Sequence, residues 1–290
     1  MRFGRRNHAT GFHLSIMQNL TLQKVVSLAP ENLIPLTTSD AVLLRGDSFE
    51  LMDRFIENGV SIPLIFSDPP YFLSNGGISC SSGKMVLVDK GVWDKSASFQ
   101  DVCNFHRSWI SRCLKLLSDN GTIWIRATQH SVFVIGYILQ ELGCTIINVV
   151  TWEKPNPPPN LSCRYFTHST ETLIWAKKNK KSKHCFNYAA MREMNDGKQM
   201  KTVWRIAAPS KSEKEFGHHP TQKPLALLQR IILAASRPGD VVLDPFAGSS
   251  TTGVAALGLK RLFIGVEKEA DFVDLAQKRL LAKLEGQKSL

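Results

Sequence analysis

Four consecutive residues, Asp68-Pro69-Pro70-Tyr71, combine an acid, two prolines and an aromatic ring directly after an apolar run at Ile62–Phe66. The run is typical of a buried strand, and a proline pair continues neither a strand ladder nor a helix. The carboxylate and the phenol are therefore expected on a stiff loop at the carboxyl end of a strand, which is where open α/β sheets place their sites.

These residue types suit the chemistry of an exocyclic amine on a nucleobase, which is a poor nucleophile because its lone pair is delocalised into the ring. The Asp68 carboxylate and a carbonyl freed by the proline pair can accept its two N–H bonds and favour a more tetrahedral nitrogen. Tyr71 can stack on a base that has left the duplex, which such chemistry requires. We therefore predict Asp68, Pro69, Pro70 and Tyr71 as catalytic residues; a turn that only ends a strand is the alternative.

A second strand that ends in an acid is expected at Asp240–Asp244, near the other end of the chain. A loop of small residues, Pro245–Gly253, and a helical pattern at Val254–Leu259 follow it. Strand, small-residue loop and helix form a mononucleotide-type cradle, in which Gly248 lets the backbone approach a ligand closely. No lysine follows, so the loop is not a P-loop. A further strand at Arg261–Glu267 ends in an acid that typically holds a ribose diol; an ordinary βαβ unit is the alternative.

Asp68-Pro69-Pro70-Tyr71 and Asp244-Pro245-Phe246-Ala247-Gly248-Ser249 together resemble the motifs of the DNA amino-methyltransferases. The catalytic motif precedes the cofactor motif, which is the order of the β class of that family. His219–Pro224 matches another segment of the class, and the resemblance covers about residues 41–280. Three longer segments are similar to the DpnA-type GATC adenine methylases, which can act on single strands: Phe72–Gly77, Asn160–Glu171 and Asn195–Met200.

The resemblance implies an α/β fold with a doubly wound, mostly parallel, seven-stranded sheet, the circularly permuted form of the S-adenosylmethionine-dependent methyltransferase fold. With the strand order 3-2-1-4-5-7-6, the strand at Val241–Asp244 lies beside the strand at Leu64–Asp68, so methyl donor and acceptor meet at one switch point. The resemblance also implies methyl transfer to adenine N6 in DNA, in GATC. Cytosine-N4 methylation, amine methylation of RNA or protein, and a DNA-binding module without activity are the alternatives.

The cofactor loop departs from the family pattern at one position, because Ser250 stands where the family usually has glycine. A serine there is strained if the position needs a positive φ. Asp47 and Ser48 contact the adenine of the cofactor by resemblance, or cap the helix that follows them, and both roles are compatible. The predicted cofactor-binding residues are Asp47, Ser48, Asp68, Thr221, Lys223, Asp244, Phe246, Gly248, Ser249, Thr251 and Glu267.

We predict a flexible basic tail at residues 1–20 and one catalytic methyltransferase domain at residues 21–290. Residues 73–98 are rich in glycine and serine and are expected to form a mobile loop that closes on the flipped base. Residues 178–218 carry a dense basic run with interleaved aromatic residues and are the candidate target-recognition insertion.

Substrate contacts are predicted from three places. Tyr71 is expected to stack on the target base, and the loop after the strand at Cys144–Trp152 lines the target-base pocket in the resembled family. Arginines of the insertion are candidates for reading guanine edges. The predicted substrate-binding residues are Tyr71, Trp152, Lys154, Asn156, Arg192 and Arg205.

The chain carries 36 basic and 25 acidic residues, a formal net charge of +11 and a sequence pI near 9.5. A basic excess fits a polyanion, so we expect DNA, double-stranded and also single-stranded, as the partner. Six widely spaced cysteines, without a CxxC pair or zinc spacing, predict free thiols and no metal. No apolar run has membrane length and no signal peptide is evident, so we expect a bacterial cytoplasmic protein. Homodimerisation and pairing with a restriction endonuclease are left open by the sequence.

Overall fold

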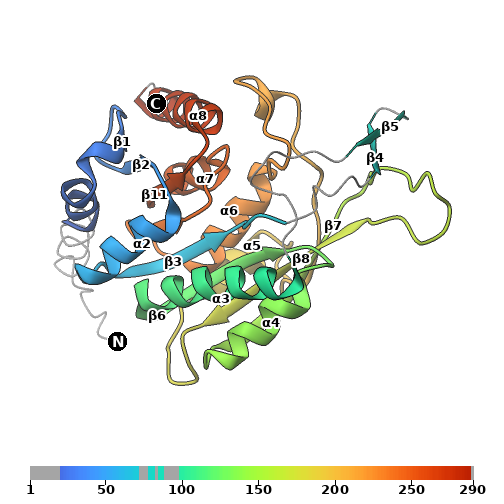
Figure 1. Cartoon of the computed structure of the whole chain (residues 1–290), viewed down its shortest axis with the longest axis horizontal. Helices are drawn as coiled ribbons and strands as arrows, with labels where there is room; N and C mark the ends of the chain where they lie inside the picture. Colours follow the sequence, from blue (N-terminus) through green and yellow to red (C-terminus); the bar gives the residue numbers. More distant parts are fainter. Residues whose placement is uncertain (1–19, 72–77, 82–83, 88–97, 289–290) are drawn as a thin grey trace, which may run out of the picture.

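The computed structural model describes residues 20–71, 78–81, 84–87 and 98–288 (Figure 1). A helical segment at residues 20–28 begins the described part. The predicted basic tail, except for its last residue, and most of the predicted mobile loop lie outside the described residues. Both therefore stay predictions.

A single nine-stranded sheet forms the centre of the described structure. Its seven middle strands follow the predicted order, but the predicted number of seven is wrong, because a short strand is added at each edge. β1 pairs with β2 in antiparallel orientation, and β9 pairs with β7 in parallel orientation. In order across the sheet, the strands are β1 (Leu33–Ile34), β2 (Ala41–Arg45), β11 (Leu262–Glu267), β10 (Val241–Asp244), β3 (Ile62–Ser67), β6 (Leu117–Ala127), β8 (Thr170–Lys177), β7 (Thr145–Glu153) and β9 (Val203–Arg205).

β10 and β3 lie side by side in the sheet, although they come from distant parts of the chain. Val242 is paired with Leu64, and Leu243 with Ile65, in parallel orientation. Both strands are short apolar runs that are almost wholly buried, as expected for parallel strands covered on both faces. Their carboxyl ends therefore reach the same edge of the sheet, which confirms that the catalytic and cofactor strands are neighbours.

β8 runs antiparallel to both of its neighbours, β6 and β7. Its first residues, including Glu171, lie at the sheet edge where β3 and β6 end. Its last residue, Lys177, is paired with Thr122 and Thr145 at the opposite edge. The basic run that follows Lys177 thus begins on the side of the sheet away from Asp68.

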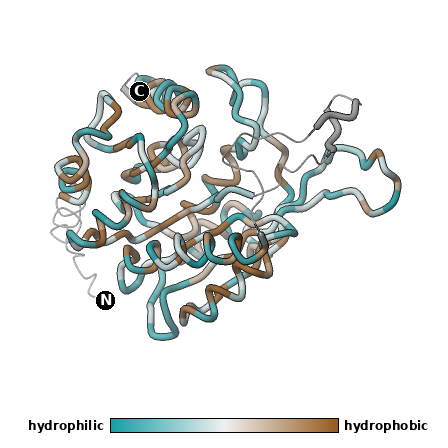
Figure 2. The backbone as a smooth tube through the Cα atoms, in the orientation of Figure 1, coloured by the Kyte–Doolittle hydropathy of each residue, from teal (hydrophilic) through white to brown (hydrophobic). Residues whose placement is uncertain are grey.

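Helices cover both faces of the sheet, which makes the fold doubly wound, as predicted (Figure 1). One hydrophobic cluster packs the segment at residues 20–28, α2, α3 and α4 on one face, and a second packs α6, α7 and α8 on the other. Figure 2 shows hydrophobic residues along the central strands and mostly hydrophilic residues in the outer connections. The helices are α2 (Ser48–Glu57), α3 (Phe99–Leu116), α4 (Val132–Glu141), α5 (Tyr188–Glu193), α6 (Leu225–Ala235), α7 (Thr251–Gly258) and α8 (Ala270–Lys288).

The predicted mobile loop and the predicted recognition insertion both contain secondary structure. β4 (Ile78–Ser81) and β5 (Lys84–Leu87) form an antiparallel ribbon inside the predicted mobile loop. The candidate recognition insertion contains α5 and β9, and β9 extends the central sheet beside β7. Among the described residues, no helix combines the length and apolar character that crossing a bilayer needs. Each described cysteine outside the ribbon is a free thiol.

Candidate active site

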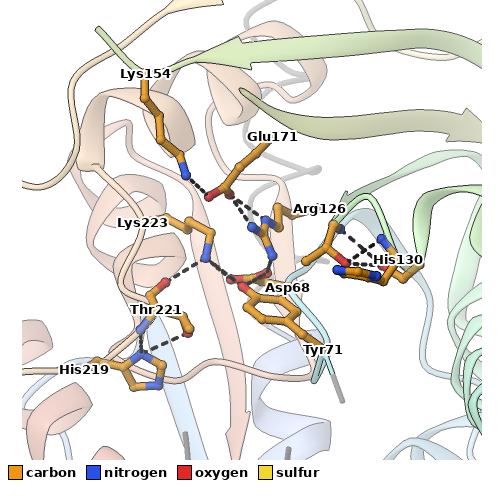
Figure 3. A network of polar contacts seen from close by, with 11 residues as sticks. Asp68, Tyr71, Arg126, His130, Lys154, Glu171, His219, Thr221 and Lys223 are labelled. Atoms are coloured by element: carbon orange, nitrogen blue, oxygen red, sulfur yellow. Dashed lines mark hydrogen bonds and ion pairs between the residues drawn. The ribbon is translucent and has the colours of Figure 1, made fainter. Parts of the chain in front are cut away.

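Asp68 directly follows β3, and its carboxylate accepts hydrogen bonds from two side chains (Figure 3). The Tyr71 hydroxyl donates to Oδ1 over 2.6 Å, and the Lys223 ammonium donates to Oδ2 over 2.5 Å. Lys223 also donates to the Tyr71 hydroxyl oxygen over 2.8 Å and to the Thr221 carbonyl oxygen over 2.7 Å. An ionised carboxylate has about four lone-pair positions, so Asp68 has capacity for a further donor. The motif around Asp68 and the segment before α6 are thus in direct contact.

Two charged residues that the sequence analysis did not single out complete this cluster. Arg126 lies near the carboxyl end of β6, and Glu171 lies at the start of β8. The Arg126 Nε donates to Glu171 Oε2 over 2.6 Å, and the Lys154 ammonium lies 2.5 Å from Glu171 Oε1. A charged residue within a buried apolar strand was the available sequence signal for Arg126, because such a charge must find a partner.

Burial and pairing shift the pKa values of this cluster. Burial opposes the charge of Glu171, but Arg126, Lys223 and Lys154 together lower its pKa to about 2. Burial lowers the pKa of the Lys223 ammonium, against the opposing effect of Asp68. Burial also raises the pKa of the Tyr71 phenol well above its ordinary value. At neutral pH Glu171 is therefore ionised and Tyr71 is a neutral hydrogen-bond donor.

A cavity of about 300 Å³ opens beside Asp68 and extends to the loop between β10 and α7. All eleven predicted cofactor-binding residues line it, and so do Pro69, Pro70 and Tyr71. Asp68 and Gly248 therefore face one continuous cavity. The sequence analysis did not predict the remaining wall residues as site residues, and these include Phe49, Phe66, Phe105, His219, Gln222, Lys268, Glu269 and Phe272.

The turn at Gly248 and Ser250 brings the backbone close to the cavity. Gly248 has a φ of +51°, which favours glycine, and a Cβ there would lie 3.0 Å from the His219 ring nitrogen Nε2, so a larger residue would also require the His219 ring to shift. Ser250 has a φ of 53°, in the left-handed region. The departure from the family pattern at Ser250 thus falls on a position that favours glycine, and the expected strain is present.

Two carboxylates on the cofactor side, the buried Asp244 and the half-buried Glu267, have no ion-pair partner among the described residues. Asp244 accepts hydrogen bonds from the Phe246 N–H over 3.1 Å and from the Thr252 hydroxyl over 2.6 Å. Glu267 accepts three, from the Gly248 N–H over 2.7 Å, the Lys268 N–H over 2.8 Å and the Glu269 N–H over 2.9 Å. Burial raises the pKa of Asp244 to about 7 and also raises the pKa of Glu267. A ligand that carries positive charge would compensate both, so this end of the cavity fits a cationic cofactor.

Both roles considered for Asp47 and Ser48 are compatible with the structure. The Asp47 carboxylate caps α2 by accepting a hydrogen bond from the Phe49 N–H over 2.9 Å. The Ser48 hydroxyl donates to the Pro245 carbonyl and so ties α2 to the cofactor loop. Both residues also line the cavity, which leaves cofactor contact as a prediction.

The other predicted substrate-binding residues are spread over a wider area. Trp152 is 2% exposed and donates its indole N–H to the Ile206 carbonyl over 2.8 Å, so its side chain lies in the core, and its predicted substrate contact stays a prediction. Lys154 joins the catalytic cluster through Glu171. Asn156 is exposed in the loop that follows β7.

The two predicted base-reading arginines lie apart. Arg205 is exposed on β9 and lies 3.8 Å from Glu153 at the carboxyl end of β7, on the side of the sheet where Asp68 lies. Arg192 follows Asn187, which is hydrogen-bonded to the carboxyl end of α6, and its Nε donates to the Gly197 carbonyl. The structure therefore brings Arg205, and not Arg192, toward the active-site edge.

Comparison with known proteins places this site in a family. A family model described as DNA methylase matches residues 62–278. The chain is 52% identical over 245 residues to the Type II methyltransferase M2.DpnII of Streptococcus pneumoniae, covering 84% of this chain and 91% of that protein. It is 48% identical over 237 residues to the Type II methyltransferase M2.MboI of Moraxella bovis, covering 82% and 86%.

Solved structures agree with these relatives. The M1.HpyAVI–SAM complex matches with a TM-score of 0.64 and 32% identity, over 83% of this chain and 98% of that one. The cytosine-N4-specific PvuII DNA methyltransferase matches with a TM-score of 0.67 over 85% and 88%, and at 20% identity it shows the fold alone. The chain therefore belongs to the DNA methylase family, the S-adenosylmethionine-dependent enzymes that methylate amino groups of DNA bases.

Proposed function

We propose that this enzyme transfers a methyl group from S-adenosylmethionine to the N6 amino group of adenine in GATC sites of DNA. The observation that carries the proposal is the one cavity lined both by the Asp68–Tyr71 loop and by the Gly248 turn with Glu267. Methyl donor and acceptor that bind in one cavity can meet without rearrangement of the sheet. The similarity to Type II methyltransferases supports modification within a restriction-modification system.

The residues at the cofactor end fit S-adenosylmethionine, which supplies an electrophilic methyl group when it is bound. The buried carboxylate of Asp244 offers negative charge to a cationic ligand, and the Glu267 carboxylate, at the end of β11, would accept hydrogen bonds from its ribose diol. Gly248 allows the backbone to approach that ligand, and the aromatic walls of the cavity provide apolar surface for its adenine. These residues bind and orient the cofactor, and they exclude water from it.

The residues at the acceptor end would activate the amine. The Asp68 carboxylate accepts one N–H of the adenine amino group, and the Pro69 carbonyl accepts the other, which makes the nitrogen lone pair available. Asp68 need not be a strong base, because the amine sheds its proton after it has been alkylated. Tyr71 stacks on the extruded base, and positioning supplies much of the acceleration.

The choice of adenine rests on Asp68, because an aspartate rather than a serine before Pro-Pro-Tyr favours adenine N6 over cytosine N4 in the resembled family. The choice of GATC rests on the segments similar to the DpnA-type methylases. Cytosine-N4 methylation by the same fold is the second candidate, and it differs from the first in the product nucleoside.

The test uses tritiated S-adenosylmethionine and matched oligonucleotides that carry GATC or the permuted GTAC, each as a duplex and as a single strand. The DNA is then digested, and the labelled nucleoside is identified by chromatography. We expect N6-methyladenine from GATC oligonucleotides only. N4-methylcytosine would overturn the choice of base, and equal labelling of both sequences would overturn the site. An RNA oligonucleotide of the same sequence is included, and label in that RNA alone would overturn the DNA substrate.

The same experiment addresses single strands, which we propose as additional substrates because of the resemblance to DpnA-type methylases. We also propose that the enzyme works in the cytoplasm of a bacterium beside a restriction endonuclease of the same specificity, since its Type II relatives come from bacteria. A homodimer is a further proposal, to be measured by sedimentation with and without DNA.

A further inference from the structure

Three charged residues of the catalytic cluster, Arg126, Glu171 and Lys154, do not line the cavity. Arg126 is 6% exposed, and the side chain of Glu171 is 13% exposed. Removing ions from water is costly, and apolar residues of similar volume often serve a protein core equally well. A contribution to fold stability alone therefore does not explain why Arg126, Glu171 and Lys154 are charged residues beside the cavity.

Glu171 fixes the orientation of the Arg126 guanidinium. Both Nε and Nη2 of Arg126 lie 2.6 Å from Glu171 Oε2. The second oxygen of Glu171 is occupied by the Lys154 ammonium at 2.5 Å. Because the guanidinium is planar and two of its nitrogens meet the same carboxylate, its plane is set by β6 and β8 rather than by solvent.

The fixed guanidinium contacts both predicted catalytic side chains. Its central carbon lies 4.2 Å from the centre of the Tyr71 ring, and the Lys223 ammonium lies 5.5 Å from the same centre, so both cations contact the ring. Its Nη1 lies 3.8 Å from Asp68 Oδ1 and has no hydrogen-bond partner among the described residues. Arg126 is thus the one residue of β6 described as contacting both Tyr71 and Asp68.

We propose that Arg126 is a positioning residue for methyl transfer and that Glu171 acts through it. Arg126 holds the Tyr71 ring at the angle at which the extruded base stacks, and it holds the Asp68 carboxylate toward the base amine. Glu171 prevents the guanidinium from turning to pair fully with Asp68, which would occupy the oxygen that the amine needs. This inference rests on the proposed methyl transfer.

The test compares Arg126→Met, which keeps the length of the side chain and removes its charge, with Arg126→Lys. Arg107→Met is the matched control, because Arg107 forms a partly exposed ion pair with Glu141 at 3.0 Å, away from the cavity. The measured quantities are the single-turnover rate on a GATC duplex and the Kd for S-adenosylmethionine. We expect Arg126→Met to lower the rate about 100-fold and to leave the Kd within about twofold. Arg126→Lys restores part of the rate, and Arg107→Met changes neither quantity.

The role of Glu171 is tested by a double-mutant cycle with Arg126. We expect Glu171→Gln to lower the rate about tenfold, and to cause no further loss in the Arg126→Met background, because Glu171 acts through Arg126. If Arg126→Met fails to fold by thermal melting, the double variant, which removes both charges, and Arg126→Lys carry the test. The proposal is overturned if Arg126→Met folds and its single-turnover rate stays within about threefold of wild type. It is also overturned if Glu171→Gln lowers the rate of Arg126→Met by the same factor, about tenfold, by which it lowers the rate of the wild type. Failure of the proposed function is distinct, because the wild type and Arg107→Met would then also be inactive.

Discussion

The carboxylates at the two ends of the cavity differ in the groups that they contact and in the direction of their pKa shifts. At the acceptor end, Asp68 in the cavity wall and Glu171 outside it lie 2.5 to 3.8 Å from the cations Lys223, Arg126 and Lys154. At the cofactor end, the carboxylates of Asp244 and Glu267 are hydrogen-bonded to backbone N–H groups and a hydroxyl, and they form no ion pair among the described residues. The pKa of Glu171 is accordingly lowered to about 2, whereas that of Asp244 is raised to about 7.

This difference in charge pairing indicates which ligand each end of the cavity suits. At the acceptor end each carboxylate is already paired with cations, so this end suits a neutral base whose amine needs only hydrogen-bond acceptors. The cofactor end holds uncompensated acid, so it gains most from a cationic ligand such as a sulfonium. The charge pattern therefore divides the cavity into an acceptor half and a donor half.

The largest effect is expected from breaking the acceptor half. Asp68→Ala removes the acceptor of the base amine and should lower the methyl-transfer rate by more than about 10³-fold. DNA affinity, measured by fluorescence anisotropy, should persist. Loss of DNA binding together with loss of the folded state would count against the assigned role of Asp68.

The next effect concerns the donor half. Because Asp244 titrates near pH 7, a cationic cofactor should bind about tenfold more weakly at pH 6 than at pH 7.5, where the carboxylate is mostly ionised. The measurement is the Kd of S-adenosylmethionine by calorimetry at both pH values. Asp244→Asn should bind weakly with little pH dependence, and an unchanged pH dependence in that variant would contradict this reading.

Glu171 and Asp244 should also make the free energy of unfolding depend on pH in opposite directions. Glu171 has a folded pKa of about 2, below its ordinary 4.5, so its contribution is present above pH 4.5 and is lost as the pH falls toward 2. Asp244 has a folded pKa of about 7, above its ordinary 3.8, so stability falls as the pH rises from about 4 to about 7. Urea titrations of Asp244→Asn should show a flatter profile between pH 4 and 7 than the wild type, and a parallel profile would disprove the assignment.

The smallest effect is expected at the turn between the halves. Ser250→Gly should raise the free energy of unfolding by about 1 kcal/mol, because glycine adopts the left-handed conformation without the clash of a Cβ. Ser250→Ala is the matched control, since it removes the buried hydroxyl but keeps the Cβ. Equal stabilisation by both variants would show that the Ser250 hydroxyl, which has no hydrogen-bond partner in the described part of the chain, and not the backbone, is the source of strain.

The sequence predicted the elements that carry short-range signals. Proline pairs, acids at strand ends and the small-residue loop around Gly248 located the catalytic and cofactor segments, and all eleven cofactor candidates line the cavity. The order of the seven middle strands was also predicted. The edge strands β1 and β9 were not, because two or three residues give no periodicity and their pairing is decided by the neighbouring strand.

The charged cluster was harder to predict because it depends on long-range pairing. Arg126 and Glu171 each lie in a strand with a strong apolar pattern, and only the antiparallel register of β6 and β8 brings them together. Trp152 was predicted to contact the substrate, but its side chain is buried and its indole N–H binds the carbonyl of Ile206, the residue after the added strand β9. In each case a contact between distant segments, rather than local sequence, decided the outcome.

The central claim is that one cavity holds methyl donor and acceptor amine side by side. The most direct test is a crystal structure of the enzyme with a non-reactive S-adenosylmethionine analogue and a GATC duplex. We predict the analogue against Gly248 and Glu267, and the adenine N6 at hydrogen-bond distance from Asp68 and about 3 to 3.5 Å from the position of the methyl group. A structure in which the adenine amine and the analogue occupy separate clefts would contradict the account.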